Sequence, residues 1–265
     1  MLKVATAQYR ATNDVQANLQ KLCEMIDRAA DGGAQLVVAP EFGNHTSFYA
    51  HPEQAWEVAI TLDGPYLHSV QEKARARSIH VVFNATRRGT QRPTAYITNF
   101  LVGPDGALIG YDDKQSLMGG EAQHLSGSDH PGKVFETAIG RIGMMSCLDG
   151  VPHETARHLA LEGAQIITNT HNSCALDEPF SHIPLRSAEN GVWTVAAGKV
   201  GPICVDEMID GLAELVQIPP HLLEALGENP ILDPRGEVIA RAPLGQEAIA
   251  FADIDPGLAD DKRWS

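Results

Sequence analysis

The order of strand-like and helix-like segments constrains this fold more than any other feature of the sequence. A β-prone run over residues 2–8 is followed by residues 15–29, where apolar side chains recur every three or four positions, as on one face of a helix. Asn13 or Asp14 can cap this helix, and a buried strand over residues 35–39 comes next. This alternation predicts an α/β fold.

The alternation continues toward the C-terminus, but two turn signals change its character. The sequences GPDG at 103–106 and DPRG at 233–236 each lie between two β-prone runs, as in a hairpin. Hairpins join antiparallel strands, so we expect mixed rather than purely parallel sheets. Further strands are predicted over 79–86, 96–102, 141–146, 165–168, 192–197 and 248–254, and helices over 66–77, 153–161 and up to 191.

The chain shows no internal boundary. No linker rich in Pro, Gly or Ser divides it, and it has no short repeat. We therefore expect one domain over residues 1–265, with a helical insertion at about 206–226 that carries Pro219-Pro220. A chain of 265 residues can bury roughly three quarters of its unfolded surface without a disulfide or metal.

Charge argues against two classes of partner. The 20 Lys and Arg residues are outnumbered by 34 Asp and Glu residues, which gives a net charge of −14. Binding of nucleic acid or of an anionic membrane surface needs a basic face, so neither partner is expected. No apolar run approaches the ~20 residues that span a bilayer.

The four cysteines are spread along the chain as Cys23, Cys147, Cys174 and Cys204. They form no CxxC pair and have no zinc-ligand spacing. We interpret them as free thiols of a cytoplasmic protein.

Cys147 lies where a predicted strand over residues 141–146 runs into a turn before the next helix. Free N–H groups at such a turn favour a thiolate and can donate to an oxyanion. The alternative is a buried cysteine that acts as a small hydrophobic residue. A nucleophilic thiol also needs a base; histidines follow Cys147, but no cysteine-protease signature surrounds it.

Three charged residues are candidates to act with such a thiol. Glu41 follows the strand over residues 35–39, immediately after Pro40, where apolar neighbours would raise its pKa and suit it to general-base catalysis; alternatively it caps the next segment. Lys114 follows a β-prone run and could hold an anionic intermediate, or could pair in solvent with a neighbouring aspartate. Glu121 follows two glycines and could equally be a polar loop residue.

The eleven histidines do not form a recognisable metal site. No HExxH motif occurs, and His153 and His158 are five residues apart, which does not align them on one helix face. We expect no metal and no cofactor.

Taken together, these segments resemble the Glu-Lys-Cys triad of the nitrilase superfamily of carbon–nitrogen hydrolases. The contexts are Pro-Glu-Phe around Glu41, Tyr-Asp-Asp before Lys114 and Ser-Cys-Leu-Asp around Cys147, in the family's order and spacing. The opening residues 3–8, the RSAEN segment at 186–190 and the hairpin over 227–236 extend the resemblance over nearly the whole chain. Glu121 matches a second glutamate that the family places near the triad.

The resemblance implies a four-layer α-β-β-α sandwich of two mixed sheets, assembled as a homodimer or larger homo-oligomer. Glu41 would take the thiol proton, and Lys114 with the backbone N–H of Leu148 would hold the oxyanion of a reaction through a thioester on Cys147. Glu121 would position the substrate or orient Lys114. Asn172 would reach the pocket in this geometry, or else face solvent from a loop.

The implied function is an amidase that hydrolyses a small linear amide to an acid plus ammonia or an amine. An N-carbamoyl amidohydrolase, a nitrilase and a catalytically silent binding protein on the same fold stay open. Many family members carry an aromatic residue and an arginine where this chain has Leu148 and Val151. That change argues against carboxylate-bearing substrates, and Leu148-Asp149 in place of Trp-Glu argues against nitriles.

Overall fold

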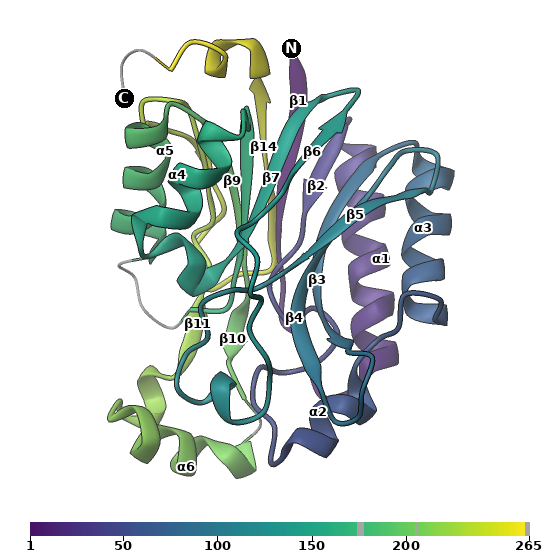
Figure 1. Cartoon of the computed structure of the whole chain (residues 1–265), viewed down its shortest axis with the longest axis vertical. Coiled ribbons are helices and arrows are strands. Elements are labelled where there is room, and N and C mark those ends of the chain that lie inside the picture. The colour runs from purple at the N-terminus through teal and green to yellow at the C-terminus, as the bar shows by residue number, and fades with distance from the viewer. Residues whose placement is uncertain (174–177, 205, 263–265) are drawn as a thin grey trace.

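Two six-stranded sheets form the centre of the molecule in a computed structural model that describes residues 1–173, 178–204 and 206–262 (Figure 1). The first sheet has the order β14-β1-β2-β3-β4-β5 and the second β13-β12-β9-β8-β7-β6. The first comprises β1 (Leu2–Gln8), β2 (Leu36–Val38), β3 (His80–Arg88), β4 (Ala95–Val102), β5 (Leu108–Asp113) and β14 (Ala248–Ile254). The second comprises β6 (Val134–Thr137), β7 (Gly140–Ser146), β8 (Ile166–His171), β9 (Trp193–Gly198), β12 (Pro230–Leu232) and β13 (Val238–Arg241).

Both sheets are mixed, and they share one pattern of pairing. In the first sheet β1, β2 and β3 are parallel, whereas β14, β4 and β5 each run antiparallel to their neighbour. In the second sheet β7, β8 and β9 are parallel, and β6, β12 and β13 are antiparallel to theirs. The GPDG turn joins β4 to β5 and the DPRG turn joins β12 to β13, so both predicted hairpins are confirmed.

Helices cover the outer faces of the two sheets. In Figure 1, α1 (Val15–Asp31) and α3 (Pro65–Arg77) flank the first sheet, and α4 (His153–Leu161) and α5 (Ile183–Asn190) flank the second. The shorter α2 (Pro52–Val58) and α6 (Asp206–Val216) both lie at the lower end of the molecule in this view, apart from each other. The expected order of helices, sheet, sheet and helices is confirmed.

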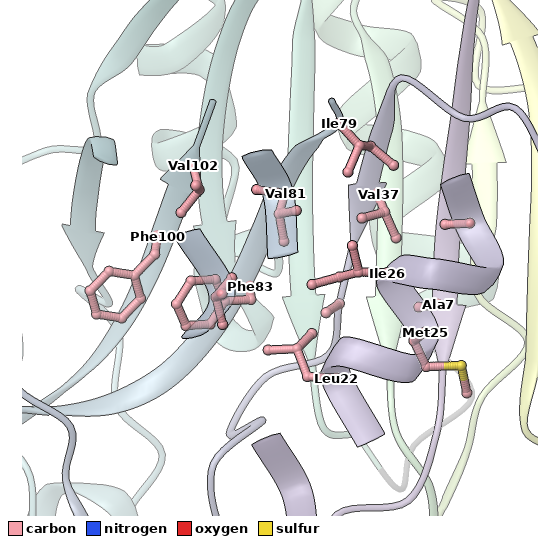
Figure 2. Close-up of a cluster of buried hydrophobic side chains, with 14 of the residues drawn as sticks. Ala7, Leu22, Met25, Ile26, Val37, Ile79, Val81, Phe83, Phe100 and Val102 are labelled. Carbon is pink, nitrogen blue, oxygen red and sulfur yellow. The ribbon is translucent and has the colours of Figure 1, made fainter. Parts of the chain in front are cut away.

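The N-terminal helix α1 shows how local sequence and packing agree. The Asp14 carboxylate accepts the backbone N–H groups of Gln16 and Ala17 at 2.9 and 3.0 Å, so Asp14 rather than Asn13 is the cap. The apolar face then packs on the outer face of the first sheet, each large side chain contributing about 1.5–3 kcal/mol. Figure 2 shows this core with Leu22, Met25 and Ile26 of the helix against Val37, Val81, Phe83 and Phe100 of the sheet.

Side chains that alternate between the two faces of a strand build two more apolar layers, one between the sheets and one beneath α4. Ile166 of β8 points into the core between the two sheets, where Val4 and Leu101 of the first sheet meet it. Its neighbour Ile167 points the opposite way and packs with Leu159 of α4. Because successive side chains alternate between faces, a strand segment that is buried on both sides carries consecutive apolar residues, as Ile166 and Ile167 do.

The expected helical insertion at 206–226 is only partly helical. After α6 and a short 3-10 helix over Pro220–Leu222, residues Glu224–Leu226 form β11, which pairs antiparallel with β10 (Val200–Pro202). The expectation of helix there is wrong because Pro219-Pro220 cannot continue a helix and the edge of β10 offers backbone partners.

One strand is longer than predicted: the strand expected at 165–168 continues to His171.

The cysteines agree with the expectation of free thiols where the structure describes them. Cys23 and Cys147 form no disulfide bond, and Cys174 lies outside the described residues. None of the helices in the described segments has the length and apolar character needed to cross a membrane.

Candidate active site

Glu41, Lys114 and Cys147 each follow the carboxyl end of a strand. Glu41 comes after β2 and Lys114 after β5. Two antiparallel pairings separate β5 from β3, so β5 runs in the direction of β2 and both residues emerge at the same edge of the first sheet. Cys147 follows β7 of the second sheet. Carboxyl ends of strands are where site residues of α/β proteins gather.

Lys114 is the centre of a buried charge cluster. Its Nζ lies 2.9 Å from Glu41 Oε1 and 3.0 and 2.9 Å from the two carboxylate oxygens of Glu121. Glu121 also accepts the backbone N–H of Met118 at 2.9 Å. Lys114 is therefore not a solvated lysine paired with a neighbouring aspartate, because it is 1% exposed and Asp113 pairs with an arginine instead.

The environment changes the acid–base properties of this cluster. Burial raises the pKa of Glu41 to about 7, against the opposing charge of Lys114. Burial by itself would lower the pKa of Lys114, but the charges of Glu41, Cys147 and Glu121 outweigh it and raise that pKa well above its usual value. Lys114 therefore stays protonated, while Glu41 can hold or release a proton near neutral pH.

Cys147 stands in a strained turn. Its φ of +44° lies in the left-handed region, which costs energy for a residue with a side chain. The Cys147 N–H donates to Asn169 Oδ1 at 3.0 Å, and Asp149 accepts the N–H groups of Ser116 and Ser146 at 2.7 and 3.3 Å. Asp149 thereby ties the loop after Lys114 to the turn that holds the thiol.

The thiol of Cys147 is protonated at rest. Burial raises its pKa well above the usual value, the charges of Glu178 and Glu41 raise it further, and Lys114 lowers it. Its Sγ lies 3.6 Å from Glu178 Oε2. A thiol in this setting needs a base before it can act as a nucleophile.

The thiol opens onto a cavity of about 320 Å³. Among the predicted residues, Glu121, Cys147, Leu148 and Asn172 line it, whereas Glu41 and Lys114 are not part of its wall. Asn172 Nδ2 donates to Ser47 Oγ at 2.7 Å, so this side chain is held in the wall. The rest of the lining is mostly apolar: Phe48, Met118, Val151, Ile203, Leu212, Ile218 and Leu223, with Ser47, Ser173, Glu178 and His182 as polar members.

Two residues of this site were not identified from the sequence. Asn169 holds the Cys147 backbone, and its place just after the strand predicted over 165–168 was a usable signal. Glu178 contacts the thiol from a short π-helix over Glu178–His182 and is 4% exposed. No motif or periodicity marks Glu178 in the sequence, because its position depends on how this segment packs.

Within residues 1–173, 178–204 and 206–262, no group of three or more His, Cys, Asp or Glu side chains is arranged to hold a metal ion.

Comparison with known proteins gives one consistent family. A family model described as carbon-nitrogen hydrolase matches residues 3–263. A nitrilase from Pyrococcus abyssi is 29% identical over 265 residues, covering 99% of this chain and 93% of that protein. A citrullinase from Francisella tularensis is 24% identical over 268 residues, covering 99% and 92%.

The fold likewise matches solved structures. One of them is an amidase from Nesterenkonia sp. AN1 with acrylamide added to its active-site cysteine. The two structures superpose with a TM-score of 0.79 at 21% identity, and the match covers 99% of this chain and 97% of that one. The nitrilase and the citrullinase are named for different substrates, so their similarity to this chain does not identify the molecule that it hydrolyses.

Proposed function

Because this chain belongs to the carbon–nitrogen hydrolase family of the nitrilase superfamily, we propose that it is an amidase acting on a small linear amide through a thioester on Cys147. The observation that carries this proposal is the buried cluster in which Lys114 Nζ lies 2.9 Å from Glu41, together with a protonated thiol at the cavity. This arrangement supplies the three groups that the reaction needs: Glu41 as the base, Lys114 as the cation and Cys147 as the nucleophile.

In the first half of the reaction, the Glu41 carboxylate takes the proton of the Cys147 thiol. The thiolate attacks the amide carbonyl, and the oxyanion that forms is stabilised by Lys114 and the backbone N–H of Leu148. Glu41 returns the proton to the leaving nitrogen, the carbon–nitrogen bond breaks, and a thioester remains on Cys147. The pKa of Glu41, raised by burial to about 7, suits it to both transfers.

In the second half, Glu41 takes a proton from water as that water attacks the thioester. The carbon–sulfur bond breaks, the acid leaves, and the proton returns to the sulfur. Glu121 holds Lys114 in place through its two oxygens, at 3.0 and 2.9 Å. Asn172 lines the substrate space.

Hydrolysis of an N-carbamoyl compound is the second candidate, since a carbamoyl group presents the same carbonyl and amide nitrogen to the thiol. Release of carbon dioxide together with ammonia distinguishes it from the amidase. A nitrilase would form acid directly from a nitrile, and a binding protein would release nothing.

The test is an ammonia-release screen over short amides, carbamoyl compounds and nitriles. Cys147→Ala should lower turnover on the order of a million-fold while the circular dichroism spectrum is unchanged. Cys23→Ala, which removes a partly buried thiol of α1, is the matched control and should keep wild-type activity. Wild-type turnover by Cys147→Ala would falsify the assignment of the nucleophile.

We also propose that residues 1–265 form one domain that assembles as a homo-oligomer in the cytoplasm. The core between the sheets supports the first part, because it takes side chains from both halves of the chain. Exposed apolar side chains on neighbouring surface elements, Leu185 of α5 and Val238 and Ile239 of β13, support the second. Light scattering tests the assembly, and cell fractionation tests the compartment.

A further inference from the structure

We propose that Glu178 selects a cationic substrate, a small amide with an ammonium group one or two carbons from the carbonyl that is attacked. This rests on the proposed amidase function and names its substrate class. Glu178 is 4% exposed, and its Oε2 faces the Cys147 thiol at 3.6 Å. It is thus at the place where the reacting end of a substrate must lie.

The carboxylate of Glu178 has bonding capacity that the protein does not use. Its Oε1 is buried without a hydrogen-bond partner, and so is Oδ1 of Asn172, whose amide nitrogen donates to Ser47 Oγ. Both residues line the cavity. Burying an acceptor, above all a charged one, without a donor is costly, so two such acceptors at one cavity indicate that a ligand supplies the donors. An ammonium has three N–H donors and no acceptor.

The charge of the cavity favours the same conclusion. Among the described residues that line it, none is a lysine or an arginine, and the ammonium of Lys114 is already held by Glu41 and Glu121. A substrate carboxylate would therefore meet Glu178 with no cation to stabilise it. The remaining wall is mostly apolar and includes Leu148 and Val151, with His182 and two serines among its polar members. The class that fits it is a short amino amide without a carboxylate.

The position of Glu178 also limits where the cation can be. The attacking sulfur must come within about 3–3.5 Å of the carbonyl carbon. An ammonium that pairs with a carboxylate beside that sulfur is then close to the carbonyl along the substrate chain. The charge of Glu178 raises the pKa of the Cys147 thiol. Binding such a cation would offset that charge and so make the thiol easier to deprotonate.

The experiment compares amides of equal shape that differ in charge: alaninamide with isobutyramide, and 3-aminopropanamide with butyramide. We expect wild-type kcat/KM to be at least about ten-fold higher for the charged member of a pair. Glu178→Gln should bring that ratio to near one, and Glu178→Asp should preserve a preference. Glu154→Gln, on the exposed face of α4, is the matched control and should leave the ratio unchanged.

Binding gives a readout that does not need turnover. In Cys147→Ala, calorimetry should detect tighter binding of alaninamide than of isobutyramide, and adding Glu178→Gln should remove the difference. Equal turnover and binding of both members by the wild type, with hydrolysis still lost in Cys147→Ala, would overturn this inference and leave the amidase proposal standing. Hydrolysis of nitriles or carbamoyl compounds but of no amide would overturn both. If Glu178→Gln fails to fold, the wild-type ratios alone decide.

Discussion

At the residue scale, burial changes the proton affinity of Glu41 and Cys147, the two groups that we propose exchange a proton, before any substrate binds. Glu41 and Cys147 are both removed from water, which raises the pKa of each. Lys114 acts against this for both groups, because its positive charge favours their ionised forms. The proton therefore rests on the sulfur, and the charge of Lys114 makes its transfer to the Glu41 carboxylate less costly.

This balance predicts a pH dependence of the rate. In the proposed mechanism Glu41 must be deprotonated to take the thiol proton, and burial raises its pKa to about 7. For an uncharged amide, kcat/KM should therefore rise with pH and reach half its plateau near pH 7. Steady-state ammonia release between about pH 5 and pH 9 measures this. Glu41→Gln, which removes the base, should lower kcat/KM by roughly a hundred- to ten-thousand-fold across this range. A wild-type profile that is flat from pH 5 upward would contradict the role of Glu41.

At the scale of elements, a polar network joins the two sheets behind the cysteine turn. Asn84 of β3 and Asn99 of β4 donate to Ser146 Oγ of β7 at 3.1 and 2.9 Å, and Asn84 also donates to Asn99 Oδ1 at 2.9 Å. Thr170 of β8 also donates to Asn99 Oδ1, at 2.8 Å. These groups are buried between the sheets, where unmade hydrogen bonds are costly, so they set how one sheet sits on the other.

Removing one member should loosen both the fold and the site. Asn99→Ala removes one hydrogen bond from each of Asn84, Ser146 and Thr170, and we expect the free energy of unfolding to fall by about 2–4 kcal/mol. Because Ser146 immediately precedes Cys147, kcat should fall as well. Urea denaturation and ammonia release measure the two effects. Gln91→Ala, which removes an exposed amide in the loop before β4, is the control and should change neither. Unaltered stability in Asn99→Ala would show that the network does not hold the sheets.

At the scale of the whole molecule, the two sheets repeat one order of parallel and antiparallel pairs, and a lysine is buried directly after β9 of the second sheet. Lys199 connects β9 to β10 and is 3% exposed. Its Nζ donates to the His45 carbonyl at 3.1 Å and lies 5.6 Å from the centre of the Phe42 ring. Among the described residues it joins no ion pair within 4.0 Å.

This lysine should make the stability of the fold depend on pH. Burial lowers the pKa of Lys199 to about 7, whereas the unfolded chain keeps the ordinary value of 10.5. Between pH 7 and 9 the unfolded state therefore holds a proton that the folded state loses. Stability gains up to about 1.4 kcal/mol per pH unit from this group as pH rises.

Lys199→Met removes this pH-dependent contribution to the free energy of unfolding. The variant should be more stable than the wild type near pH 6–7, and its advantage should shrink by about 2 kcal/mol between pH 7 and 9. Urea denaturation at several pH values measures the difference. Lys133→Met, at an exposed lysine, is the control and should show no such trend. An advantage that stays constant with pH would mean that Lys199 is charged in the fold throughout.

Much of the element order could be predicted from the sequence because it depends on local chemistry. The spacing of apolar residues identified α1, and the turn residues of 103–106 and 233–236 identified two hairpins. Glu41, Lys114 and Cys147 could be singled out because each follows a β-prone run, and family motifs surround them. What failed locally was β11, where a backbone partner from β10 outweighed the helical tendency of the insertion.

By itself, the sequence determined much of the order of strands and helices and which side chains are able to react. Only the tertiary structure decided that Lys114 lies between Glu41 and Glu121, that Asn172 lines the cavity, and that Glu178 faces the thiol. The reason is that periodicity records which face of one element is buried. Contacts between residues 73 apart, such as Lys114 and Glu41, arise from strand order and from the packing of one sheet on another, which no local pattern encodes.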